Sequence, residues 1–311
     1  MSPASRTPAP SSATLYPEPA PMPDSPTLTR RELLRAAGLA FGAAAALPLA
    51  ARAAGAAPRA PARVPGIQLY TVRALMQQDV EGTLAALAKM GYKEFEFAGY
   101  FGRDPHALRK TLDGLGVTAP SAHIPLETLR TALGPALDAA AVLGHQYIVC
   151  PYLVDAERTP DGFARVADDL SRIGREVKAR GMQLAYHNHD FEFKPMADGQ
   201  LPYDMILTRT DPSLVKMEVD LYWITYAGQD PLKYIAAHPG RFPLCHVKDL
   251  QRTAAGARQM ADVGQGTIDF RTIFLHGEQA GFKHYFVERD DAKDPLASAR
   301  ASERALQALL A

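Results

Sequence analysis

From Pro65 to the C-terminus, short apolar runs alternate with longer stretches of helical periodicity. The runs are rich in β-branched and aromatic residues, which predicts strands. They cover Gly66–Val72, Glu94–Gly99, Ala119–Ile124, Tyr147–Tyr152, Met182–His189, Val215–Trp223, Pro243–Asp249 and His284–Arg289. Helices are predicted over Val80–Met90, Leu126–Leu143 and Phe163–Arg180. Glycines at 91, 116, 144, 181 and 281 follow helical stretches, which is typical of helix C-termini.

This alternation determines the predicted fold class. Repeated strand–helix units imply parallel strands with right-handed crossovers. Eight units over about 245 residues predict one α/β domain, a (β/α)8 TIM barrel over 65–311. A doubly wound sheet is the competing fold, but it would have fewer units. Its dinucleotide-binding form also needs a glycine-rich first turn, and the turn here is Tyr70-Thr71-Val72-Arg73.

The N-terminal segment has a different composition. Residues 1–28 are rich in Pro, Ser and Ala, which predicts disorder. Arg30-Arg31 then precede an uncharged run, Ala36–Ala50, and the small-x-small sequence Ala51-Arg52-Ala53. This order resembles a twin-arginine export signal, and the run is too short for a permanent membrane span. An uncleaved amphipathic helix or anchor is the alternative.

We therefore expect 1–53 to be a disordered N-terminus with a twin-arginine signal peptide and 54–64 to be a linker. The expected partner is the twin-arginine export machinery, and the expected location is the periplasm.

Overall charge and cysteine content exclude some functions. Lys and Arg number 34, as do Asp and Glu, so the formal net charge is zero. The chain thus has no charge excess for nucleic acid or an acidic membrane. Cys150 and Cys245 lie in apolar runs, which favours buried free thiols over a disulfide.

Polar residues are concentrated where the predicted strands end, and in a TIM barrel this edge carries the active site. They are Glu96, Ser121, His123, His187, His189, Glu192, Glu218, Asp220, Tyr222, Trp223, His246, Lys248, Asp249 and Glu288. Residues two apart on a strand share a face, so His187 pairs with His189, and His246 with Lys248. The apolar residues Val219 and Val247 favour an inward direction for their neighbours.

These side chains could hold a metal. Two imidazoles with carboxylates make a mixed nitrogen and oxygen ligand set, which suits Mn, Zn, Fe, Co or Ni better than Ca. A single histidine at a strand end is more often a hydrogen-bonded structural residue. Acidic or histidine residues at four consecutive strand ends indicate a metal site.

Several motifs together resemble one known family. They are Gly66-Ile67-Gln68-Leu69-Tyr70, Tyr186-His187-Asn188-His189-Asp190-Phe191-Glu192-Phe193, Glu218-Val219-Asp220, His246-Val247-Lys248-Asp249, Gly264-Gln265-Gly266-Thr267-Ile268-Asp269-Phe270 and Val287-Glu288. In this order they resemble the xylose isomerase-like TIM barrels, the sugar phosphate isomerase/epimerase superfamily, from Gly66 to the C-terminus.

The resemblance implies one divalent metal held on strands five to eight. It places Asp220, His246 and Glu288 as ligands. On strand five many relatives have Glu before Asn-His, whereas this chain has His187, which we take as the fourth ligand with His189 as the alternative. The site loses one negative charge, which favours Mn, Zn or Co over Mg.

The resemblance also implies proton abstraction next to a carbonyl. The predicted catalytic residues are Glu288, His189, Lys248 and His123, and Lys248 could have a depressed pKa or bind an oxyanion. The predicted substrate contacts are Glu96, Glu192, Tyr222 and Trp223. Glu218 is expected to hydrogen-bond a ligand residue, and Gly264-Gln265-Gly266 is expected to be a turn rather than a phosphate loop.

Four functions remain open. Export favours an unphosphorylated sugar or keto-sugar as substrate, converted by a metal-dependent isomerase or epimerase. Loss of one of the two carboxylates used by such epimerases makes a 3-keto-glycoside lyase a serious alternative. A non-catalytic sugar-binding protein would carry no stoichiometric metal. Zero net charge argues against a DNA-cleaving enzyme of the endonuclease IV group.

Overall fold

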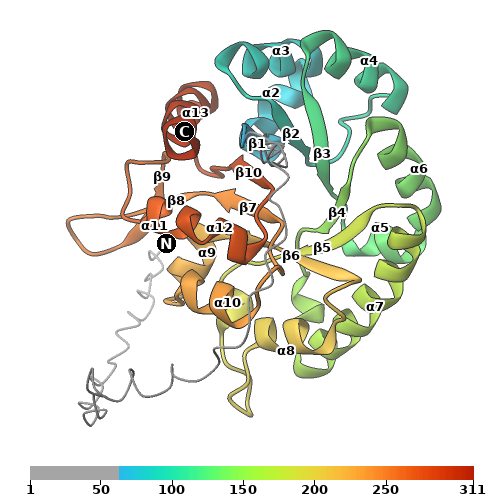
Figure 1. The fold of residues 1–311 in the computed structure, drawn as a ribbon, viewed down its shortest axis with the longest axis vertical. Helices are drawn as coiled ribbons and strands as arrows, with labels where there is room; N and C mark the ends of the chain where they lie inside the picture. Colours follow the sequence, from blue (N-terminus) through green and yellow to red (C-terminus); the bar gives the residue numbers. More distant parts are fainter. Residues whose placement is uncertain (1–62) are drawn as a thin grey trace, which may run out of the picture. The chain divides into compact units, whose positions relative to one another are not determined.

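The computed structural model describes residues 63–311 (Figure 1). The expected signal peptide over 1–53 and most of the expected linker lie outside the described residues. Across 63–311, no helix has the length and apolar character needed to cross a membrane.

Eight parallel strands form a closed barrel in the order β1-β10-β7-β6-β5-β4-β3-β2 (Figure 1). These are β1 (Pro65–Gln68), β2 (Glu94–Phe97), β3 (Thr118–His123), β4 (Tyr147–Cys150), β5 (Gln183–His187), β6 (Val215–Asp220), β7 (Leu244–Val247) and β10 (His284–Val287). Each predicted run overlaps one of them. The predicted (β/α)8 barrel is therefore confirmed.

Helices follow the strands and surround the barrel (Figure 1). They are α2 (Arg73–Gln78), α3 (Val80–Met90), α4 (Pro105–Leu115), α5 (Leu126–Thr131), α6 (Leu133–Leu143), α7 (Pro160–Ala179), α8 (Pro202–Arg209), α9 (Leu221–Tyr226), α10 (Pro231–Ala237), α11 (Phe270–Leu275), α12 (Gly277–Ala280) and α13 (Pro295–Leu310). Three short 3₁₀ helices complete the list: η1 (Leu69–Val72), η2 (Asp155–Glu157) and η3 (Phe191–Phe193).

Some predicted boundaries were wrong. The first run leaves the sheet after Gln68 and turns into η1. The sixth run ends at Asp220, whose side chain accepts the Trp223 N–H at 2.8 Å and so caps α9. Tyr222 and Trp223 are therefore helical. The single helix expected over Leu126–Leu143 is two helices, because Pro135 has no N–H to bond the preceding turn.

The barrel interior has its own apolar layer. Tyr147, Val149, Ala185, Leu244 and Phe286 are buried together inside the barrel, separate from the larger core. Val219 and Val247 belong to that larger core. Because side chains alternate along a strand, residues two positions after the inner layer also point inward, nearer the C-terminal end. Both cysteines are buried free thiols, as predicted.

A two-stranded antiparallel hairpin, β8 (Asp249–Arg252) and β9 (Arg258–Ala261), follows β7 and was not predicted. The Asp249 carboxylate fixes the glycine-rich turn after it, accepting N–H groups from Gly264 and Gly266 at 2.9 Å each. A Cβ at Gly266 would meet Asp249 Oδ1 at 2.2 Å, so only glycine fits there. These amides bond to Asp249, which agrees with a turn rather than a phosphate loop.

Candidate metal centre

Four predicted ligand residues meet at the C-terminal end of the barrel. β5 ends at His187 and β6 ends at Asp220. His246 lies within β7, and Glu288 follows β10. All four are buried, and one ligand atom from each lies within 4.8 Å of the others. His187 Nε2 is 3.9 Å from Asp220 Oδ2, and His246 Nδ1 is 3.1 Å from Glu288 Oε2. We call these four residues the upper group.

The upper group passes a test of whether a cation fits it. Asp220 is fully buried, and its Oδ2 has no hydrogen-bond partner among the described residues. Burial raises the pKa of this carboxyl to about 7, although Lys248 and His246 oppose the shift. A divalent cation would satisfy the unpaired oxygen and favour its charged form. Imidazole and carboxylate together suit a transition metal or zinc.

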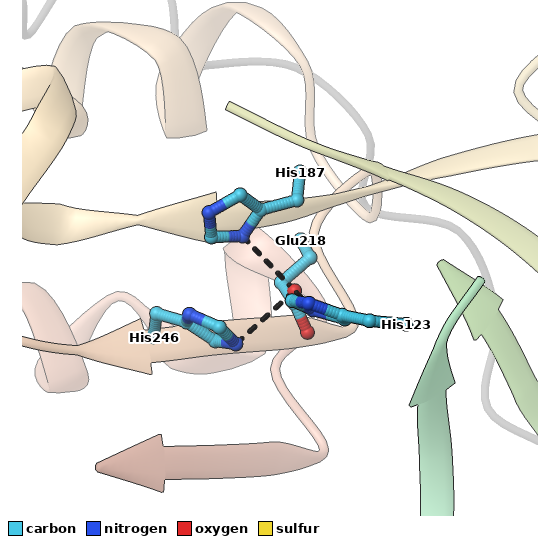
Figure 2. Close-up of side chains that lie close together, drawn as sticks. All are labelled: His123, His187, Glu218 and His246. Carbon is cyan, nitrogen blue, oxygen red and sulfur yellow. Dashed lines mark hydrogen bonds and ion pairs between the residues drawn. The ribbon is translucent and has the colours of Figure 1, made fainter. Parts of the chain in front are cut away.

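Beneath the upper group, three imidazole rings surround Glu218 (Figure 2). Glu218 Oε2 lies 3.0 Å from His187 Nδ1, 3.1 Å from His246 Nε2 and 2.7 Å from His123 Nε2. The other ring nitrogen of each residue, His187 Nε2 and His246 Nδ1, faces Asp220. Glu218 therefore sets the orientation of both rings, which is how carboxylates commonly support metal-binding histidines.

His123, His187, Glu218 and His246 form a second set that could hold a cation. We call it the lower group. It shares His187 and His246 with the upper group through their other ring nitrogens. A neutral imidazole offers one lone pair to a metal, so each shared ring can serve only one group at a time.

Glu96 lies beside the lower group, to which His123 belongs. Glu96 is fully buried and accepts hydrogen bonds from Gln68 Nε2 at 2.9 Å and Ser121 Oγ at 2.5 Å. Its Oε2 also lies 2.6 Å from His246 Nε2. These protein contacts occupy both oxygens, so the structure argues against the expected substrate contact of Glu96.

His123 is tied to the same carboxylates. Burial lowers the pKa of His123, but Glu96 and Glu218 outweigh it and raise this pKa to about 10. Two carboxylates therefore hold His123, and the catalytic role expected of it stays a prediction.

Lys248 is held by carboxylates. Its Nζ donates to Glu288 Oε2 at 2.9 Å and to Asp290 Oδ2 at 2.7 Å. Burial lowers the pKa of Lys248, but Glu288, Asp220 and Asp290 outweigh burial and raise it. These carboxylates oppose the depressed pKa considered from the sequence, which stays a prediction for a site that holds a metal. A charged Lys248 suits the other expected role, which is to bind an oxyanion.

The segment after β5 is held by Glu192. Its Oε1 accepts the Tyr186 hydroxyl at 2.6 Å, and its Oε2 accepts the His189 N–H at 2.8 Å. Glu192 is fully buried, and burial raises its pKa to about 7. It therefore positions His189, and the expected substrate contact is not supported.

His189 itself lies beside the upper group, with its ring 4.9 Å from that of His187. Its Nδ1 is buried without a partner in the described chain, and its ring lies 5.5 Å from Trp223. Burial, with the nearby Lys248, lowers the pKa of His189 to about 3, so the ring is neutral. Trp223 is half-buried with Lys248 Nζ 5.3 Å from its ring, whereas Tyr222 packs against Leu250 and Met260 beside the hairpin. The substrate contacts expected of both residues stay predictions.

Comparison with known proteins gives the family. Residues 84–309 match the model of the xylose isomerase-like TIM barrel. The chain belongs to this family. Inosose dehydratases from Lacticaseibacillus casei and Geobacillus thermodenitrificans are 25% and 26% identical to it. The alignments cover 74% and 73% of this chain and 89% and 87% of those proteins.

Solved structures agree with this family assignment. A sugar phosphate isomerase/epimerase from Parabacteroides distasonis has a TM-score of 0.67 and 26% identity, over 82% of this chain and 96% of that one. The IolI protein with a bound zinc atom has a TM-score of 0.62 and 14% identity, over 79% of this chain and 98% of that one, and shows the fold alone. The family and its relatives confirm the prediction of an enzyme of the isomerase, epimerase or lyase kind.

The sequence assigned no role to three residues of this xylose isomerase-like site, of which only Ser121 was among the polar residues expected at the strand ends. Gln68 and Ser121 hold Glu96, and Asp290 holds Lys248. Asp290 carried a usable signal, since it lies two positions after Glu288 and alternation predicts the same face. Gln68 carried none, because its role depends on β1 pairing with β2.

Proposed function

We propose that this enzyme removes a proton next to the carbonyl of an unphosphorylated keto-sugar and then eliminates the group on the adjacent carbon. His187 carries the proposal, because this imidazole lies on strand five where relatives of the two-carboxylate kind have Glu. An epimerase needs a base on each face of the substrate carbon, whereas elimination needs one. The relatives named inosose dehydratase give further support, since a dehydratase eliminates water.

The upper group would hold the metal. His187, Asp220, His246 and Glu288 are the proposed ligands, and the proposed metal is Mn, Zn or Co. When bound, the metal polarises the carbonyl and stabilises negative charge on its oxygen. Glu218 would keep the His187 and His246 rings in the orientation that this requires.

We assign proton removal to His189. Its Nδ1 has no hydrogen-bond partner among the described residues and its ring lies 5.5 Å from Trp223, whereas Glu288 Oε2 is bonded to Lys248. As the C–H bond breaks, its electron pair moves toward the carbonyl oxygen, and charged Lys248 stabilises the negative charge. The pair then forms a C=C bond while the bond to the leaving oxygen breaks, and His189 returns the proton to that oxygen.

Isomerisation or epimerisation is the second candidate. It begins with the same proton removal, and the Parabacteroides distasonis structure named sugar phosphate isomerase/epimerase supports it. The two reactions separate afterwards, because in epimerisation the proton returns to carbon.

We place the reaction in the periplasm. Arg30-Arg31, the uncharged run Ala36–Ala50 and Ala51-Arg52-Ala53 support export by the twin-arginine machinery. Replacing both arginines by lysine should keep the protein in the cytoplasm, as measured by cell fractionation. Export of the double variant at the normal level would contradict this route.

Reaction in deuterium oxide tests the chemistry. The metal-loaded enzyme is given a 3-keto-glucoside, and the products are followed by NMR and mass spectrometry. We expect release of the C1 substituent together with an unsaturated keto-sugar. Recovery of an intact glycoside with deuterium next to the carbonyl and an inverted centre would overturn elimination in favour of epimerisation.

A further inference from the structure

An arc of aromatic rings lies beside the upper group, at the C-terminal ends of the barrel strands. It runs over the ends of three neighbouring strands, with Tyr152 after β4, His189 after β5 and Trp223 after β6. The His189 ring lies 5.2 Å from Tyr152 and 5.5 Å from Trp223. The same ring lies 4.9 Å from His187, so the arc is continuous with the upper group. We call Tyr152, His189 and Trp223 the aromatic arc.

The outer end of the arc is exposed and braced. Tyr152 is 47% exposed, whereas nearly all other large apolar side chains of the described chain are covered. The Arg158 guanidinium lies 4.7 Å from the Tyr152 ring and 3.7 Å from the Phe191 ring. Phe191 in turn stacks on His189 with an interplanar angle of 11°. Arg158 and Phe191 thus hold Tyr152 in place with one side open to solvent.

Polar atoms along the arc lack partners. His189 Nδ1, Trp223 Nε1 and one terminal nitrogen of Arg158 are buried without a hydrogen bond among the described residues. Buried polar groups are normally paired, so unpaired polar atoms among aromatic rings point to a ligand that would satisfy them. Aromatic faces stack on sugar C–H surfaces and on other rings, while ring hydroxyls can bond to the free nitrogens.

We propose that the aromatic arc is a second subsite, which binds a ring attached to C1 of the substrate. The inference rests on the proposed elimination, because this ring would be the leaving group. A free monosaccharide or keto-cyclitol has no such ring, so the arc points to a keto-glycoside. The ring can be aromatic or a second sugar, since both present a flat face for stacking.

Trp223 makes the subsite directly measurable. It is the only tryptophan in the chain, so its fluorescence reports ligands at the arc without any turnover. The protein is titrated with phenyl, glucosyl and methyl glucosides that carry no keto group. We expect the phenyl or glucosyl compound to change the Trp223 signal at roughly three- to ten-fold lower concentration than the methyl compound. Equal responses to all three would overturn the subsite.

Variants of Tyr152 locate the effect. Tyr152→Ala should remove the preference for a second ring while metal content stays unchanged, and Tyr152→Phe should retain most of it. Leu275→Ala is the matched control, because Leu275 is 80% exposed at the end of α11. A preference that survives in Tyr152→Ala would contradict the assignment.

Turnover then separates the two proposals. With keto-glucosides, Tyr152→Ala should raise KM roughly three- to ten-fold more for ring-bearing substrates than for the methyl substrate. If the wild-type enzyme turns over no keto-glycoside, elimination fails while the fluorescence preference still decides the subsite. If all substrates lose equally, the subsite fails while elimination stands.

Discussion

Two layers inside the barrel come from the same strands and differ in almost every other respect. Ala185, Leu244 and Phe286 form part of the apolar layer. His187, His246 and Glu288 lie two residues further along the same three strands and belong to the upper group. Both layers point into the barrel, so direction does not distinguish them. Their distance from the C-terminal end does.

The apolar layer affects the chemistry of the polar layer above it. By filling the barrel interior, it removes water from beneath the charged groups, which strengthens the interactions among them. Burial raises the pKa of Asp220 in this setting, whereas beside Lys248 and His246 the pKa of Glu288 is held well below its usual range despite burial. The apolar layer is thus expected to govern stability, and the upper group metal binding and turnover.

Removing an upper-group ligand should have the largest effect. We expect Asp220→Ala or His246→Ala to lose stoichiometric metal and to reduce turnover by roughly three orders of magnitude or more, because a bound metal supplies several kcal/mol. Elemental analysis and steady-state kinetics check both. The exposed residues Asp211 and His276, replaced by alanine, are matched controls. Full metal content in both site variants would contradict the upper group.

His189 should separate catalysis from metal binding. His189→Ala should lower kcat by about 10²–10⁴-fold, typical for loss of an acid–base group, while metal content is retained. Glu288→Gln should weaken metal binding as well as turnover, because Glu288 belongs to the upper group. Normal turnover in His189→Ala, with a slow but fully metal-loaded Glu288→Gln, would move the base to Glu288.

The apolar layer should respond in stability instead. Phe286→Ala leaves a cavity inside the barrel and should lower the free energy of unfolding by about 3–5 kcal/mol. Urea unfolding measures this value, and metal per folded molecule should stay unchanged. A decrease in the free energy of unfolding below about 1 kcal/mol would contradict this role of the apolar layer. Loss of metal from the folded variant would show that metal binding also depends on this layer.

Glu218 gives the smallest effect and decides between the two possible cation positions. Glu218→Gln should weaken metal affinity about 10–100-fold, as expected for a residue that orients ligand histidines. Competition with a chelator measures this affinity. Complete loss of metal in Glu218→Gln, together with full metal in Asp220→Ala, would place the cation in the lower group.

Pattern alone predicted the barrel and the inward side chains, because strand–helix alternation and the two-residue repeat are local properties. Prediction from pattern failed where other interactions overrode the local pattern. The run Val215–Trp223 continues as an apolar segment, yet Asp220 caps a helix and moves Tyr222 and Trp223 into α9. The hairpin of β8 and β9 escaped because its strands are short and partly polar.

The sequence by itself determined which residues could carry the chemistry and that they would gather at one end of a barrel. Only the tertiary structure decided how those residues divide between roles. Glu96, His123 and Glu192 satisfy their hydrogen bonds within the protein, whereas Asp220 Oδ2 and His189 Nδ1 do not. Whether a buried polar atom has a partner depends on neighbouring strands brought together by folding. No linear pattern contains that information.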